Sequence, residues 1–158
     1  MRVTDAFLLA AVVGSGIMGD RLAGGNVAIA LLANTLATGA ALLALILTFG
    51  GLSGAHFNPV VSFVDAAFGG RSWHDAAAYL PAQVAGCTAG AVIANLMFGL
   101  HAVVMSTRER ASAAHFVSEV VATLGLLLVI FALARTGRAR SAAAAVGAYI
   151  GAAYFFTS

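Results

Sequence analysis

Charged residues are scarce in this sequence, and lysine is absent altogether. Only 9% of the 158 residues are charged and 61% are hydrophobic, whereas soluble domains carry about 25% charged and about 45–50% apolar residues. The net charge of +2 is spread along the chain. The composition therefore excludes a soluble globular domain, a disordered chain and a nucleic-acid-binding module. The single cysteine, Cys87, excludes an intrachain disulfide. These exclusions leave a membrane protein.

The apolar runs set the number of membrane spans. A spanning helix needs about 20 apolar residues, so a chain of this length holds about five. The first run is short and follows Arg2, so a signal peptide is an alternative for that segment. We predict an all-α membrane protein, a single membrane domain over residues 1–158 with about five transmembrane helices. The runs lie at residues 6–18, 27–50, 76–100, 116–134 and 141–156.

The placement of arginine predicts how the chain is oriented. Arg135, Arg138 and Arg140 form a compact cluster in a short loop, which favours the cytoplasmic side. The N-terminus is then also inside, and Arg108 and Arg110 lie outside. We expect a multi-pass protein of the inner (plasma) membrane.

Two glycine patterns allow different interpretations. Residues 14–19 read GSGIMG, which matches the dinucleotide-binding pattern G-x-G-x-x-G, but no acidic residue follows at the required distance of about 20 positions. We interpret these glycines as helix-packing positions. Two pairs spaced four apart lie within apolar runs and predict close helix contacts, because small residues let backbones approach in lipid. These pairs are Gly86 with Gly90, and Gly147 with Gly151.

Asn58-Pro59 predicts the start of a short helix inside the membrane. Asn is a strong N-cap and Pro is favoured at the first helical position. A glycine-rich turn precedes the pair, and the apolar segment after it is too short to span. Irregular backbone at membrane depth is tolerated only against protein or a water-filled cavity. We predict a re-entrant half-helix at about residues 58–68, although a capped cytoplasmic loop is an alternative.

Residues 53–62, SGAHFNPVVS, closely resemble the first signature of the aquaporin (major intrinsic protein) family, S-G-A-H-x-N-P-A-V-T. The departures are Val60 and Ser62. Residues 118–123, SEVVAT, look like the opening of the family's second repeat. Residues 13–38 are similar to bacterial members of the aquaglyceroporin type.

The resemblance implies an aquaporin-like helical bundle. Residues 1–100 correspond to the first repeat and residues 101–158 to part of the second. The family has six spans and two Asn-Pro-Ala motifs, and its first-repeat glutamate would fall on Met1. Since this sequence holds one Asn-Pro pair, the bundle is expected to be incomplete and the polypeptide by itself to be a poor or inactive channel.

The resemblance also implies passive transport of water or small neutral solutes, such as glycerol or metalloid hydroxides, and no enzymatic activity. Asn58 would offer side-chain donors to the solute, Pro59 would start the half-helix, and Val60 would face the narrow point. His56 would anchor the turn, or simply pack. Thr38, 20 positions before Asn58, would line a wide selectivity constriction, or pack between helices.

Glu119 would buttress the re-entrant loop by accepting backbone N–H groups. The expected partners are the lipid bilayer, small neutral solutes and further copies of the chain, since the family forms tetramers. No cofactor, metal or nucleic acid is expected. Three alternatives remain: a non-functional remnant, a small membrane scaffold associating through its glycine faces, and half of a secondary transporter. The last needs a coupling-ion site, for which Asp65 and Glu119 are the only acids near the motifs.

Overall fold

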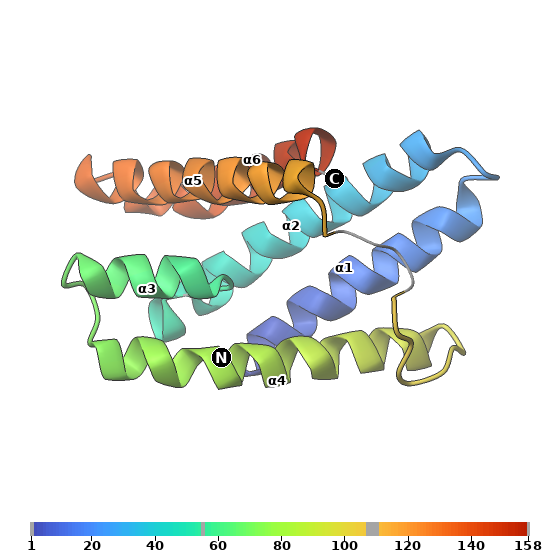
Figure 1. Ribbon diagram of the computed structural model, residues 1–158, viewed down its shortest axis with the longest axis horizontal. Coiled ribbons are helices and arrows are strands. Elements are labelled where there is room, and N and C mark those ends of the chain that lie inside the picture. Colours follow the sequence, from blue (N-terminus) through green and yellow to red (C-terminus); the bar gives the residue numbers. More distant parts are fainter. Residues whose placement is uncertain (1, 55, 107–110, 158) are drawn as a thin grey trace. The chain divides into compact units, whose positions relative to one another are not determined.

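The computed structural model describes residues 2–54, 56–106 and 111–157, and within these residues it contains helices and turns but no strand. Ala55 of the signature, and Arg108 and Arg110 of the predicted external loop, lie outside the described residues. The elements in chain order are α1 (Arg2–Leu22), α2 (Val27–Ser53), α3 (Pro59–Ala67), α4 (Trp73–Met97), α5 (Ala113–Arg135), the 3-10 turn η1 (Ala139–Ser141) and α6 (Ala142–Phe156) (Figure 1).

Four of these helices are long and apolar enough to cross a membrane: α1, α2, α4 and α5. The predicted run at residues 6–18 is part of the longer helix α1. Asp5 lies in the first turn of α1, where the positive end of the helix dipole favours an acid. The predicted fifth span is α6, whose 15 residues extend about 22 Å and so fall short of a bilayer's hydrocarbon core of about 30 Å. The turn η1 takes up only Ser141 of that run, so α6 matches the predicted run to within one residue.

The chain divides into two compact units. The first contains Met1–Gly14 and Leu45–Ala102, and the second contains Ser15–Ala44 and Val103–Ser158. The second unit therefore combines part of the predicted first repeat with nearly all of the partial second repeat. Each unit is described by itself.

In the first unit, α3 packs against α4. The turn between them begins with Gly69 at a φ of 79°, which glycine adopts without strain, and Gly70 N–H donates to the carbonyl of Asp65 at 2.9 Å. Ser72 then caps α4 by accepting from Asp75 N–H at 3.0 Å. These caps end one helix and start the next within six residues, so α3 is set against α4 by a turn with little freedom.

The first unit also contains a close approach of α4 to α1. A Cβ atom at Gly90 would lie 2.8 Å from the Cβ of Leu9 and 2.9 Å from the Cα of Ala6. Only glycine fits there without a shift of backbone. Gly86, one turn earlier, is buried.

In the second unit, α5 packs against α6. Tyr149 of α6 donates its hydroxyl to the carbonyl of Ala122 at 3.0 Å, and its ring fills the space above Gly125. On the other side of α6, a Cβ at Gly147 would lie 2.8 Å from the carbonyl oxygen of Gly39, and one at Gly151 would lie 3.6 Å from the methyl group of Thr35. The α2 and α6 backbones therefore meet at glycine.

The Gly90 contact predicts that Gly90→Ala destabilises the protein by about 1–3 kcal/mol, the range for forcing a methyl group into a packed site. Unfolding in mixed SDS micelles followed by circular dichroism measures this. Gly51→Ala is the matched control in the same unit, because a Cβ there meets no atom within 4 Å. The control should be neutral or stabilise by up to about 1 kcal/mol through helix propensity. A neutral Gly90→Ala would contradict the close approach of α1 and α4.

Candidate functional site

The start of α3 is built around Asn58. Its backbone is extended, with φ −133° and ψ 125°, and its side-chain oxygen accepts from the N–H of Val60 at 2.8 Å. Pro59 occupies the first helical position, where its missing N–H costs nothing. Because the Oδ1 atom faces the helix, the Nδ2 donors of Asn58 point away from it. The arrangement offers hydrogen-bond donors beyond the end of α3.

The first turn of α3 has one exposed side. Val60 is 42% exposed, whereas Val61 and Ser62 are 4% and 1% exposed. Hence Val60, beside the cap, is the apolar side chain available at this end of the helix.

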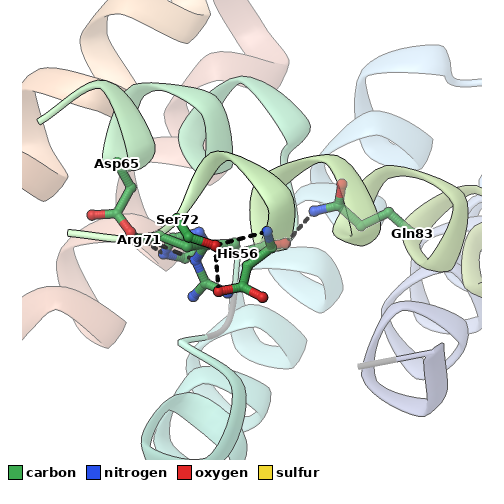
Figure 2. Close-up of polar contacts among 6 residues, drawn as sticks. His56, Asp65, Arg71, Ser72 and Gln83 are labelled. Carbon is green, nitrogen blue, oxygen red and sulfur yellow. Dashed lines mark hydrogen bonds and ion pairs between the residues drawn. The ribbon is translucent and has the colours of Figure 1, made fainter. Parts of the chain in front are cut away.

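His56 ties the loop before α3 to two helices (Figure 2). Its carbonyl oxygen accepts a hydrogen bond from Gln83 of α4. Its ring meets the ring of Tyr79 edge to face, with centroids 6.3 Å apart, and its Nε2 atom lies 4.0 Å from Asp65 of α3. The loop that delivers Asn58 to the helix is therefore held from both α3 and α4.

Arg71 completes this cluster. Its Nε atom lies 3.7 Å from Asp65 Oδ2 (Figure 2). Its guanidinium carbon lies 4.1 Å from the centre of the Tyr79 ring. A Cβ at Gly54, whose φ of 71° already favours glycine, would lie 2.9 Å from the Arg71 side chain. Sequence reasoning missed Arg71, Tyr79 and Gln83. Gln83 could have been found as a polar amide side chain within the otherwise apolar run 76–100.

The charges around His56 act on its pKa in opposite directions. His56 lies outside the four helices that are long enough to span. Burial lowers the pKa of His56 and the Arg71 cation lowers it further, whereas Asp65 raises it. Asp65 lies within 4.0 Å of both cationic or potentially cationic groups, the Arg71 guanidinium and the His56 ring.

Thr38 lies in the second unit, within a polar cluster. It is 2% exposed, and its hydroxyl donates to Asn34 Oδ1 at 3.3 Å and contacts the Tyr154 hydroxyl at 3.2 Å. Asn34 and Tyr154 are further residues that sequence reasoning missed. The sequence indicates them only weakly. Asn34 is a polar residue four positions before Thr38, and Tyr154 is a tyrosine in the last apolar run.

The other predicted site residues are distributed over the two units. The structure brings His56, Asn58, Pro59 and Val60 together in the first unit, whereas Thr38 belongs to the second. Glu119 is exposed on α5, and its role as a buttress stays a prediction. In the part of the chain that the structure describes, no group of three or more His, Cys, Asp or Glu side chains could hold a metal ion.

Long apolar helices joined by a capped, shorter helix define a multi-pass helical membrane protein with an interrupted segment. The chain belongs to the major intrinsic protein family, whose model matches residues 3–158. This match confirms the resemblance seen in the signature at residues 53–62. Members of the family are channels and not enzymes, as the sequence predicted.

Relatives from bacteria and plants agree with this assignment. Aquaglyceroporin AqpS of Rhizobium meliloti (strain 1021) is 51% identical over 151 residues, covering 96% of this chain and 64% of the relative. Aquaporin NIP1-4 of Oryza sativa subsp. japonica is 42% identical over 119 residues, covering 73% of this chain and 44% of the relative. The chain therefore spans less than two thirds of the length of these relatives.

The cap geometry predicts that Asn58→Ala costs about 1 kcal/mol of folding stability, because the N–H of Val60 loses its acceptor. Asn58→Asp is the matched control, since a carboxylate retains the acceptor. Unfolding in mixed micelles compares the two variants. An equal loss of folding stability in both variants would show that the hydrogen bond from Val60 N–H to Asn58 does not stabilise α3.

The charges around His56 predict opposite effects of two substitutions. Arg71→Met should raise the His56 pKa by removing a cation, and Asp65→Asn should lower it by removing an anion. An NMR pH titration of the His56 Cε1–H resonance in micelles, assigned with His56→Asn, measures both. Shifts in the same direction would contradict this electrostatic arrangement.

Proposed function

We propose that this chain forms a membrane channel for passive transport of water or small neutral solutes, with glycerol and metalloid hydroxides as the solute class. The observation that carries the proposal is α3, a short helix that starts at an Asn-Pro cap and presents the donors of Asn58 at its N-terminus. Membership in the major intrinsic protein family supports it.

The physical reason is the charge at the start of a helix. The free N–H groups and the dipole make this end positive, so it repels cations and protons. The Nδ2 donors of Asn58 would replace part of the hydration of a neutral solute in single file. Val60, larger than the alanine of the family signature, would narrow the path beside the cap.

Solute size would be set in the second unit. Thr38 is small, so a constriction lined by it would admit glycerol-sized molecules as well as water. The name of the bacterial relative, an aquaglyceroporin, agrees with this solute class. Glu119 would buttress the re-entrant loop by accepting its backbone N–H groups.

The finer assignments are also proposals. The membrane is the bacterial inner membrane, and the oligomer is a tetramer of the family type. The glycine contact between α2 and α6 supports close helix packing within one copy. It also keeps open the alternative of a small scaffold that associates without conducting.

Osmotic swelling of vesicles that contain only the 158-residue polypeptide tests the channel. We expect low flux of water and glycerol, because one Asn-Pro half-helix supplies half of the donors that paired half-helices would. Asn58→Asp should reduce this flux to that of protein-free vesicles, since it replaces two donors by acceptors. Flux that is unchanged by Asn58→Asp would contradict the role of α3. Association of the polypeptide with no flux at all would favour the scaffold.

A further inference from the structure

An open apolar groove runs along the second unit between α2 and α6. Its volume is about 420 Å³. Its walls include Leu36, Ala40 and Leu43 of α2, and Ala144 and Ala148 of α6. Among its described lining residues, Thr35 is the only one with a polar side chain. A hydrated solute finds almost no hydrogen-bond partner here, so the groove fits a hydrocarbon chain and not the solutes of the proposed channel.

The groove lies beside a close contact of the two helices. Gly39 and Gly147 bring the α2 and α6 backbones together at its floor. α5 packs on the other side of α6, where Tyr149 donates to the Ala122 carbonyl. Leu36, at the edge of the groove, is 65% exposed. The groove is therefore an apolar surface that a membrane component can reach.

One end of the groove carries a positive charge. The turn η1 runs directly into α6, and Ser141 and Ala142 both have helical backbone angles. Arg140 therefore lies one turn before Ala144 on the same face of the helix. Because side chains tilt toward the N-terminus of their helix, the guanidinium of Arg140 is directed beyond the end of the groove. This end lies on the predicted cytoplasmic side of the membrane.

The acids in the described part of the second unit lie far from this charge. They are Asp20 and Glu119. Glu119 lies 16 residues before Arg135, which is about 24 Å along α5. Asp20 lies near the end of α1, which leads into the opposite end of α2 from the arginine-rich turn. The exposed guanidinium of Arg140 is therefore available to an anion from outside the chain.

We propose that the groove binds an acyl chain of an anionic phospholipid, whose phosphate group pairs with Arg140. A volume of about 300–1,000 Å³ is typical of small-molecule sites, and the groove falls within it. From Ala144 to Gly151 the groove extends about 10 Å along α6, which is less than the hydrocarbon depth of one leaflet, about 15 Å. The negative potential of the cytoplasmic leaflet attracts arginine to the same place.

A second copy of the chain fits the groove less well than a lipid. Two copies with the same orientation in the membrane, related by a twofold axis, would place both Arg140 side chains at the same depth. Like charges there oppose association, whereas a lipid phosphate neutralises the charge. Lipid binding at this groove needs no conduction, so it holds equally for a polypeptide that conducts nothing.

Quenching of tryptophan fluorescence by brominated acyl chains tests the site. In a Trp73→Phe background, Leu43→Trp places a reporter at the groove, and Leu128→Trp places one at an exposed position on α5 as the control. Vesicles contain phosphatidylglycerol and phosphatidylcholine with the same acyl chains, one of the two brominated. We expect phosphatidylglycerol to be preferred about fivefold at Leu43→Trp, the effect of one arginine near the surface, and no such preference at Leu128→Trp. Equal quenching by the two lipids at Leu43→Trp would overturn the proposal.

Two arginine variants test the headgroup contact. Arg140→Gln should remove the preference for phosphatidylglycerol, and Arg138→Gln should keep it. Arg138 is the matched control because it carries the same charge in the same turn, whereas its Nε atom donates to Thr136 Oγ1 at 3.4 Å and so faces the end of α5. An equal loss in both variants would show a general attraction of anionic lipid to this turn and would overturn the assigned site.

Mass spectrometry of the unmodified 158-residue polypeptide tests the site without a tryptophan in the groove. The polypeptide is released from micelles that contain phosphatidylglycerol and phosphatidylcholine in equal amounts. We expect phosphatidylglycerol to be retained on the chain and to be lost in Arg140→Gln. Retention of both lipids to the same extent, or of neither, would overturn the proposal.

Cysteine cross-linking tests for a second copy in the groove. In a Cys87→Ser background, Ala148→Cys places a thiol in the groove, and Ala132→Cys places one at an exposed position on α5 as the control. We expect disulfide-linked dimers of Ala148→Cys to form in vesicles no faster than those of Ala132→Cys. Faster dimer formation at Ala148→Cys would show that another copy occupies the groove, and would overturn the lipid site.

Discussion

The first N–H groups of a helix have no partner within the helix, and hydrocarbon offers none. In this protein the Asn58 side chain accepts a hydrogen bond from the N–H of Val60. Pro59 has no N–H, so it needs no partner. A few side-chain contacts in the first unit hold the loop before this cap and the helix after it. The carbonyl of His56 is bound by Gln83, and Asp65 on α3 is paired with Arg71. The same cap leaves the donors of Asn58 for a solute, so structural need and proposed function meet in one side chain.

Both units bury few polar side chains. In the first unit the polar contacts gather around the loop before α3. In the second they form the line from Ser15 through Asn34 and Thr38 to Tyr154. Elsewhere the helices meet through glycine, as at Gly39 with Gly147. Association in lipid gains little from hydrophobic burial, so close backbone contact and a few hydrogen bonds carry it.

Much of the fold could be predicted from local patterns. Run length located the four long helices, and the Asn-Pro pair located α3 to within a residue at its start. The first run was harder, because Thr4 and Asp5 interrupt the apolar pattern of α1 although both are buried. A pattern of apolar residues does not predict that a polar residue is buried.

The sequence by itself determined the membrane class, the family and the capped half-helix, because composition, run length and the Asn-Pro cap act over a few residues at a time. Only the tertiary structure decided the partners of these residues. Thr38 meets Tyr154 across 116 positions, and His56 meets Gln83 across 27. Such contacts depend on which helix faces come together, and no local pattern carries that information. Sequence therefore identified the cap, whereas three-dimensional packing defined what holds it.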